Sequence, residues 1–483
     1  MRSLGKRLLS LMLILAACAA VLLPVLRTPV LEERIEEEET VTARPFDGKT
    51  TLILWYTDEA LTDYLNRQAV EFGKTAGDTR VLPVLVSGLG LLESALESSI
   101  DGTDYPDLYI TTHDNLEKAA LAGIAGEVEH AEDVLRGDSF PESALNSVTW
   151  HGLRIAYPFY GETVALLYNR TYLEDEAKLL AEEDGKTAPE GEELAACVQS
   201  YLPEKIGDLL EFAGHYNAPD EVEAVFSFDV NDLFTDYFFA GDAIDVGGPA
   251  GDDPDQVSLY NERVLTCMDI YQQLGQFFAV DSKNVGEDKV LQDFIDGKTV
   301  FTIATTEAVE RLRTARDSGE CDFVFGAAPL PALTESIDTR ALSVTNCIVV
   351  NGFSEHMTEA NRFATFLSGN ATTDLYARTG KMPAGYRADY GEDSQVSDMM
   401  RAYYSVYENS APMPKMIETS NYWIRLEVAF TDIWNGAEVN ATMREVAGQL
   451  LSQIRGRQVD VDPIPDPPSI PISEELSEES EEE

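Results

Sequence analysis

The segment from residue 157 to 169, YPFYGETVALLYN, constrains the fold of this chain more than any other. It joins an extended passage containing proline and glycine directly to an apolar run, with one carboxylate, Glu162, at the joint. Pro158 lacks a backbone donor, Gly161 permits close approach of other groups, and residues 164–168 indicate a buried strand. The pattern fits a crossing between two lobes, or a tight turn into a core strand that leaves Glu162 in solvent.

The length and the net charge of the chain limit its domain organisation and its possible partners. The chain has 483 residues, more than one hydrophobic core usually supports, so we expect more than one lobe or domain. Hydrophobic residues make up 44% and charged residues 25%, a balance typical of a globular protein. The formal charge of -51 repels phosphate backbones and anionic lipid headgroups alike, so we expect no nucleic acid partner.

Residues 1–26 predict an export signal and membrane anchor. Basic residues near the N-terminus precede an uncharged run over residues 8–26, an order that leaves the rest of the chain outside the cytoplasm. The sequence LAAC ending at Cys18 resembles a bacterial lipobox, in which Cys18 would become the lipid-modified N-terminus after cleavage. The run stays apolar up to residue 26, which favours an uncleaved transmembrane helix. Either anchor places the body of the protein on the extracellular face of the bacterial membrane.

Acidic, low-complexity segments flank the globular part. Residues 27–49 form an acidic linker, and residues 458–483 form an acidic, proline-rich tail that we expect to be disordered. A tail that binds calcium or a partner is the alternative.

Cysteine spacing gives no metal motif. Cys197, Cys267, Cys321 and Cys347 are widely separated, without a Cys-x-x-Cys pair. Extracellular disulfides and buried free thiols both fit this spacing, and free thiols are expected if the organism is an anaerobe.

From residue 51 the chain alternates between strand-like and helix-like patterns. Strands are predicted over residues 52–56, 81–86 and 106–111, and amphipathic helices over residues 61–72 and 89–100. This order indicates an open parallel sheet, whose ligands bind beyond the carboxyl ends of the strands. The loops that follow the first and third strands supply candidate binding residues: Asp58, Glu59 and Asp114.

Asp114 fits two roles. It stands three residues before Glu117, so the pair could form a capping box at the start of the next helix. A carboxylate fixed at the carboxyl end of a strand can equally accept hydrogen bonds from two hydroxyl groups of a ligand. The local sequence leaves both roles open.

The common catalytic and cofactor motifs are incomplete in this chain. Glycine-lysine-threonine triplets occur at residues 48–50, 185–187 and 297–299 without the upstream glycine of a phosphate loop. The five histidines are spaced too widely for a local metal site. These absences favour a binding protein over an enzyme, with no cofactor and no metal.

Taken in order, several segments resemble the extracellular solute-binding proteins of the maltose/maltodextrin type, which are the receptor subunits of ABC importers. The likeness extends from about residue 51 to 454 and rests on order and spacing, because no single segment is specific. The segments are LILWY at 52–56, YPDLYITTHD at 105–114, the joint at 157–169, FIDGKTVFTI at 294–303, GAAPLP at 326–331, and APMP at 411–414 ahead of Tyr422 and Trp423.

The resemblance implies an α/β, two-lobed periplasmic-binding-protein fold of type II, which closes on a saccharide by hinge motion. Three crossings between discontinuous lobes are implied near residues 159–163, 341–346 and 381–384. The implied lobes are residues 50–160 with 346–383 for lobe 1, and residues 161–345 with 384–457 for lobe 2.

The resemblance also implies ligand-binding roles. Asp114 and Glu162 match positions where sugar binders of the family hold hydroxyl groups. Trp423 matches a stacking aromatic, although its helical spacing also fits an ordinary core tryptophan. The loop at Asp58 and Glu59 matches a polar contact region.

Departures from the family pattern narrow the range of ligands that we expect. Thr111 and Glu307 stand where maltodextrin binders carry further stacking aromatics, so an extended glucan shelf is not expected. Glu307 also begins a convincing helix, where an acid complements the helix dipole. If the candidate carboxylates face one cleft, they disfavour uronates and sulfated sugars and favour neutral or amino sugars.

The implied function is a non-catalytic, membrane-anchored receptor that captures a small carbohydrate and delivers it to ABC transporter permease subunits. The chain is expected to be a monomer. The alternatives are a surface glycoside hydrolase with a carboxylate pair such as Asp114 and Glu162, and a sensory or adhesive binding subunit.

Overall fold

The computed structural model describes residues 48–278, 280–370, 374–386 and 388–472. The predicted anchor with Cys18, nearly all of the acidic linker and residues 473–483 lie outside the described residues. The chain from Thr50 onward forms one compact unit. Within the described ranges, no helix combines the length and the apolar character needed to cross a membrane.

Strands β1, β2 and β3 form the parallel part of the larger sheet. Their bounds, with those of the connecting helices, are Thr50–Tyr56 for β1, Thr62–Ala76 for α2, Thr79–Leu85 for β2, Leu91–Asp101 for α3 and Leu108–Thr112 for β3. β1 pairs in parallel with both β2 and β3. The predicted alternation of strands and helices is therefore confirmed, with ends shifted by a few residues.

Antiparallel strands complete the larger sheet. β13 (Leu342–Val350) lies between β3 and β6 (Tyr157–Glu162) and is antiparallel to both. β14 (Met382–Pro383) pairs with the other edge of β6, and β15 (Ala411–Pro412) pairs with the start of β13. The resulting order is β14-β6-β13-β3-β1-β2.

The joint after β6 carries the chain into a second sheet. β7 (Val164–Asn169) belongs to a smaller sheet of order β12-β7-β11-β8, and only Thr163 separates it from β6. Val164 and Leu166 face one hydrophobic cluster, whereas Ala165 and Leu167 face another. Burial on both faces explains the uninterrupted apolar run. The other strands of this sheet are β8 (Ala224–Ser227), β11 (Thr299–Thr305) and β12 (Phe325–Ala328).

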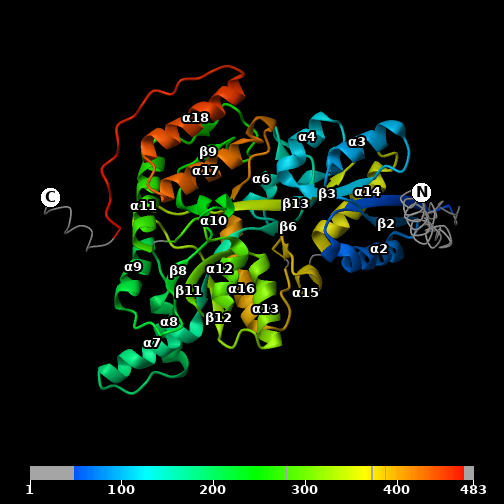
Figure 1. Cartoon of the computed structure of the whole chain (residues 1–483). Coiled ribbons are helices and arrows are strands. Elements are labelled where there is room, and N and C mark those ends of the chain that lie inside the picture. Colours follow the sequence, from blue (N-terminus) through cyan, green and yellow to red (C-terminus); the bar gives the residue numbers. More distant parts are fainter. Residues whose placement is uncertain (1–47, 279, 371–373, 387, 473–483) are drawn as a thin grey trace, which may run out of the picture. The chain divides into compact units, whose positions relative to one another are not determined.

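Helices cover both faces of the smaller sheet. One face packs against α9 (Ile206–His215), α11 (Glu262–Phe278), α17 (Tyr422–Trp434) and α18 (Val439–Arg455). Figure 1 shows α17 and α18 side by side next to α11. The other face packs against α12 (Glu287–Ile295), α13 (Glu307–Ser318) and α16 (Ser394–Asn409).

Shorter or peripheral elements fill the rest of the described chain. They are α4 (Leu116–Leu121), α5 (Ala131–Val134), α6 (Glu142–Ser147), β4 (Thr149–Trp150), β5 (Leu153–Arg154), α7 (Arg170–Glu183), α8 (Gly191–Tyr201), α10 (Leu233–Asp236), β9 (Asp245–Val246), β10 (Val257–Ser258), α14 (Met357–Thr365) and α15 (Leu375–Thr379).

The segments predicted as crossings lie side by side at one end of β6. Gly161 pairs with Met382 of β14 on one side, and Glu162 pairs with Val344 of β13 on the other. Two discontinuous lobes that close about one hinge require this adjacency, because each crossing must bend at the same place. The boundaries of the two lobes remain predictions.

Residues 458–472 differ from the prediction of a disordered tail. They follow an extended path over α11 and α18, and we call them the C-terminal strap. Gln273 Nε2 donates a hydrogen bond to the carbonyl of Ile470 at 3.1 Å, and Asn440 Nδ2 donates one to the carbonyl of Ile464 at 2.9 Å. Prolines restrict the unfolded chain, so ordering this segment costs less entropy than its composition suggests.

The cysteines of the described residues are free thiols. Cys267, Cys321 and Cys347 are buried, and Cys197 is half-buried. The free-thiol alternative is therefore the one that the structure shows, with Cys197 less buried than expected.

Candidate functional site

A cleft of about 510 Å³ opens where the predicted crossings meet. Its walls come from the turn η1 (Glu59–Leu61) after β1, from the end of β6, from residues 379–382 and from α12 and α13. These elements belong to segments on both sides of the crossings. The cleft is therefore the place where a ligand would contact both predicted lobes.

Lys381 lies among the carboxylates of this cleft. Its Nζ is 2.9 Å from Asp58 Oδ2 and 3.0 Å from Glu307 Oε1, and its side chain is only 14% exposed. The ammonium also lies 5.7 Å from the centroid of the Tyr160 ring. Burial alone would lower the pKa of Lys381, but the hydrogen bonds to Asp58 and Glu307 outweigh it and raise the pKa. Lys381 thus stays charged and joins two predicted binding residues.

Glu162 lines the same cleft at the end of β6. Its Oε1 accepts a hydrogen bond from Asn346 Nδ2 at 3.2 Å, and the residue is half-buried. Burial raises the pKa of Glu162 above its ordinary value, and neighbouring Glu307 and Asp58 add to the effect. Lys381 and Asn346 oppose the shift without cancelling it. At the joint Glu162 lines a cleft, and the crossing between two lobes remains a prediction.

Asp58 and Glu307 combine local and tertiary roles. Asp58 caps η1, because its Oδ1 accepts a hydrogen bond from the Ala60 backbone at 2.9 Å, while its other oxygen meets Lys381. Glu307 is the first residue of α13, where an acid complements the helix dipole, and it also meets Lys381. The helix-start prediction for Glu307 and its placement at the cleft are therefore compatible.

Glu59 and Asp114 do not line this cleft. Glu59 is exposed within η1. Asp114 lies inside the turn η2 (His113–Asn115), half-buried beside the buried His113. Their ligand-binding roles remain predictions.

The predicted capping box at Asp114 is wrong. The chain enters α4 through a 3-10 turn, so Asp114 lies within the turn and Asn115 precedes the helix without a side-chain cap. Glu117 does not reach back to the helix start. Its Oε2 accepts a hydrogen bond from the Ile417 backbone at 2.7 Å, a tertiary contact that local sequence does not specify.

Trp423 also lies outside the lining of the cleft. It is half-buried on α17, with its ring centroid 5.0 Å from that of Tyr422 and 6.2 Å from that of Tyr237. This aromatic packing agrees with the core-tryptophan alternative. A stacking role toward a ligand remains a prediction.

Two residues of the cleft were missed as binding candidates. Lys381 stands at the start of the third predicted crossing. The sequence pattern therefore located this residue but did not indicate that its charge would meet the cleft carboxylates. Glu287 begins α12, and its Oε1 accepts a hydrogen bond from Thr305 Oγ1 at 3.0 Å. An acidic residue at the start of a helix is common, so the sequence carried no separate sign that Glu287 lines a cleft.

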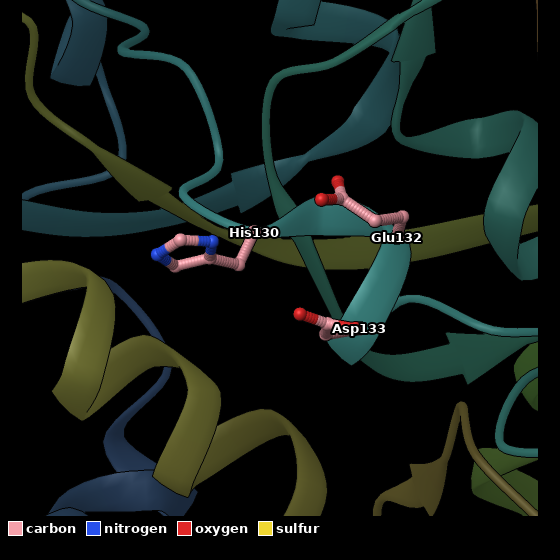
Figure 2. A group of neighbouring side chains, drawn as sticks. All are labelled: His130, Glu132 and Asp133. Carbon is pink, nitrogen blue, oxygen red and sulfur yellow. The ribbon is translucent and has the colours of Figure 1, made fainter.

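Away from the cleft, one group of side chains in the described residues has the spacing of a metal site. The ligand atoms of His130, Glu132 and Asp133 lie within 4.8 Å of one another. Figure 2 shows all three around the short turn that opens α5. All three are exposed, and exposed groups of this kind are common without an ion.

The model of the bacterial extracellular solute-binding protein family matches residues 69–397, which include the whole smaller sheet, most strands of the larger sheet and most residues that line the cleft. This chain belongs to that family. The predicted resemblance is thereby confirmed at the level of the family and the fold.

Relatives of this solute-binding protein carry the same fold. A maltooligosaccharide ABC transporter solute-binding lipoprotein of Streptococcus pneumoniae serotype 4 is 20% identical over 406 residues, or 82% of this chain and 87% of the relative. A cyclo/maltodextrin-binding protein complexed with maltotetraose superposes with a TM-score of 0.68 at 20% identity, covering 85% of this chain and 98% of that chain. An extracellular solute-binding protein from Staphylococcus aureus in complex with maltose gives 0.69 at 17% identity, covering 85% and 99%.

The same comparisons bear on the catalytic alternative. The named relatives of this solute-binding protein are binding proteins. The carboxylate pair considered for a hydrolase is not assembled in the cleft, because Glu162 lines it and Asp114 does not.

Proposed function

We propose that this protein is the extracellular receptor of an ABC importer, which captures a small carbohydrate between its lobes and delivers it to the permease subunits. The observation that carries the proposal is the polar cleft at the three adjacent crossings. Hinge bending there would close α12 and α13 toward η1 over a ligand. Membership of the solute-binding family and the sugar-binding relatives support it.

Three of the predicted residues support the proposal. Glu162 and Glu307 line the cleft and can accept hydrogen bonds from sugar hydroxyls. Lys381 adds a donor, and Asp58 is linked to the cleft through its contact with Lys381. In this proposal the protein is a monomeric, non-catalytic receptor.

A thermal-shift experiment with a saccharide panel tests the proposal. A ligand present at about a hundred times its dissociation constant should stabilise the protein by about 2.7 kcal/mol. Peptides, polyamines and metal salts serve as the comparison panel. Stabilisation by one of those compounds, with none by any saccharide, would overturn the carbohydrate assignment.

We further propose that the N-terminal segment holds the receptor on the cell surface. Intact-mass measurement of membrane-extracted protein separates the two anchors. Cleavage before Cys18 with lipid attachment changes the mass in a way that an uncleaved transmembrane helix does not. The full-length, unmodified mass would exclude the lipid anchor.

A further inference from the structure

Carboxylates outnumber cations on the walls of the cleft. Among its described lining residues, the carboxylates are Glu162, Glu287, Asp288, Glu307, Glu310 and Glu320, and the cations are Arg311 and Lys381. Both cations are already engaged. Arg311 Nη1 lies 2.7 Å from Asp288 Oδ1, and Lys381 holds Asp58 and Glu307.

Glu162 and Glu287 accept hydrogen bonds from neutral side chains. The donors are Asn346 Nδ2 for Glu162 and Thr305 Oγ1 for Glu287. Partial desolvation raises the pKa of Glu287, and the neighbouring carboxylates of Asp232 and Glu307 raise it further. The pKa of Glu162 is raised in the same sense. Both groups would gain from a cation placed beside them.

The described residues that line the cleft include no aromatic side chain. A neutral pyranose gains much of its affinity from packing its apolar face on an aromatic ring. That contribution is missing from these walls. Charge is therefore the strongest recognition element that the cleft offers.

Lys381 shows how the cleft accommodates an ammonium. Its Nζ bridges Asp58, the cap of η1, and Glu307 of α13, and it lies over the face of Tyr160. A ligand amine would meet the same chemistry at Glu162 and Glu287, which Lys381 does not bind directly.

We propose that the ligand of this cleft is a cationic sugar, carrying a protonated amine that Glu162 or Glu287 receives. This inference rests on the proposed function, because it names the class of carbohydrate that the same cleft takes. Lys381 then serves as an internal cation that holds Asp58 and Glu307 until the lobes close. Ligands that carry an acid, a sulfate or a phosphate are rejected by the same carboxylates.

Calorimetric titration of the detergent-solubilised full-length protein tests the inference with sugars that differ only at the amine. The probes are the β-1,4-linked disaccharide of glucosamine, its N-acetylated form, and cellobiose, with maltose as a further neutral sugar. We expect the amine form to bind at least about tenfold more tightly than the others. Its affinity should fall when NaCl is raised from about 0.05 M to about 0.5 M, because salt screens charge attraction.

Single substitutions distinguish an effect of the cleft carboxylates on binding from an effect of the overall charge of the protein. Glu287→Gln keeps an acceptor for Thr305, and we expect it to weaken the amine form about tenfold with little effect on neutral sugars. Glu192→Gln, on α8 and outside the cleft lining, removes the same charge and should change nothing. Lys381→Gln removes the internal cation and should strengthen binding of the amine form. A role of these residues in folding alone would not move the affinity in opposite directions.

The possible outcomes test the cationic-sugar inference separately from the proposed function as a carbohydrate receptor. Equal binding of the amine and neutral disaccharides would overturn the cationic-sugar inference and leave the carbohydrate receptor standing. Loss of affinity in Glu192→Gln equal to that in Glu287→Gln would also overturn it. Binding of no saccharide at all would remove the proposed function, and the inference with it.

Discussion

At the residue scale, the electrostatics of the cleft depend on Glu162, a half-buried carboxylate with a neutral hydrogen-bond donor. Its pKa in the folded protein is raised above the ordinary value of 4.5. Between the ordinary and the raised pKa the folded protein binds more protons than the unfolded chain. Glu162 therefore lowers stability as pH rises through that window. A group placed for binding is here unfavourable for folding.

Glu162→Gln should make the ligand-free protein more stable at neutral pH and weaken its ligand about tenfold. The amide keeps the acceptor for Asn346 and removes the buried charge. Denaturant unfolding at several pH values measures the first effect, and the advantage should vanish below about pH 4, where the parent carboxyl is protonated. A stability difference that does not vary with pH would contradict the explanation.

Gly161 is constrained by packing. A Cβ built at Gly161 would lie 2.5 Å from Cε2 of Tyr407, whose hydroxyl is 2.7 Å from Thr345 Oγ1 in the buried core. We expect Gly161→Ala to destabilise the protein by about 1–3 kcal/mol in urea unfolding. Gly137→Ala is the matched control, because a Cβ there meets nothing within 4 Å. Equal stability of the two variants would show that the Tyr407 side chain can move aside without cost and would contradict the prediction.

At the scale of elements, the C-terminal strap is part of the fold. Val461, Ile464 and Ile472 are half-buried against the hydrophobic cluster that includes α11 and α18. The carbonyl of Ile472 lies so close to α9 that a Cβ at Gly207 would come within 2.6 Å of it. Apolar contacts and backbone hydrogen bonds together order a sequence that looks disordered by composition.

Truncation after Arg457 should lower the free energy of unfolding on the order of 2 kcal/mol, because the apolar contacts of the strap are lost. Ligand affinity should not change, since the strap does not line the cleft. Truncation after Ile472, which removes only residues 473–483, is the control and should leave stability at the parent value. Parent-like stability in the shorter variant would mean that the strap contributes nothing.

At the scale of the whole molecule, His113 joins three segments that are far apart in the sequence. Its Nδ1 accepts a hydrogen bond from the Thr345 backbone at 3.1 Å, so its Nε2 carries the proton and donates to the Met413 carbonyl at 2.8 Å. Thr345 and Met413 are 232 and 300 residues away along the chain. Burial, reinforced by the charge of nearby Lys415, lowers the pKa of His113 to about 4.

His113→Gln should flatten the acid side of the stability profile. Between about pH 6.5 and pH 4 the unfolded chain binds a proton that folded His113 does not, so the parent loses stability as pH falls, by about 1.4 kcal/mol per pKa unit. The variant starts less stable but should lack this component in denaturant unfolding across that range. His215→Gln, exposed on α9, is the control. Profiles of parent and His113→Gln that run parallel would contradict the prediction.

Local sequence patterns predicted the order of strands and helices well, because these elements depend on residues that are close together in the sequence. Alternation of apolar strands with amphipathic helices predicted the parallel part of the larger sheet, and the joint at Gly161 and Glu162 predicted the passage between sheets. At Asp114 local sequence left a capping box and a ligand-binding role open, and the structure has a 3-10 turn in place of the capping box. Local patterns failed at the C-terminal strap, whose order comes from contacts with helices far away in the chain.

The sequence by itself determined the alternation of elements, the crossing at the joint and the membership of a solute-binding family. Periodicity, proline and glycine act within a few residues, so they are visible without a structure. Only the tertiary structure decided which charges meet. Asp58, Glu307 and Lys381 come from separate segments, and their contact depends on how the crossings pack beside one another. That packing made the cleft a site in which both lining cations hold carboxylates, while Glu162 and Glu287 have neutral hydrogen-bond donors.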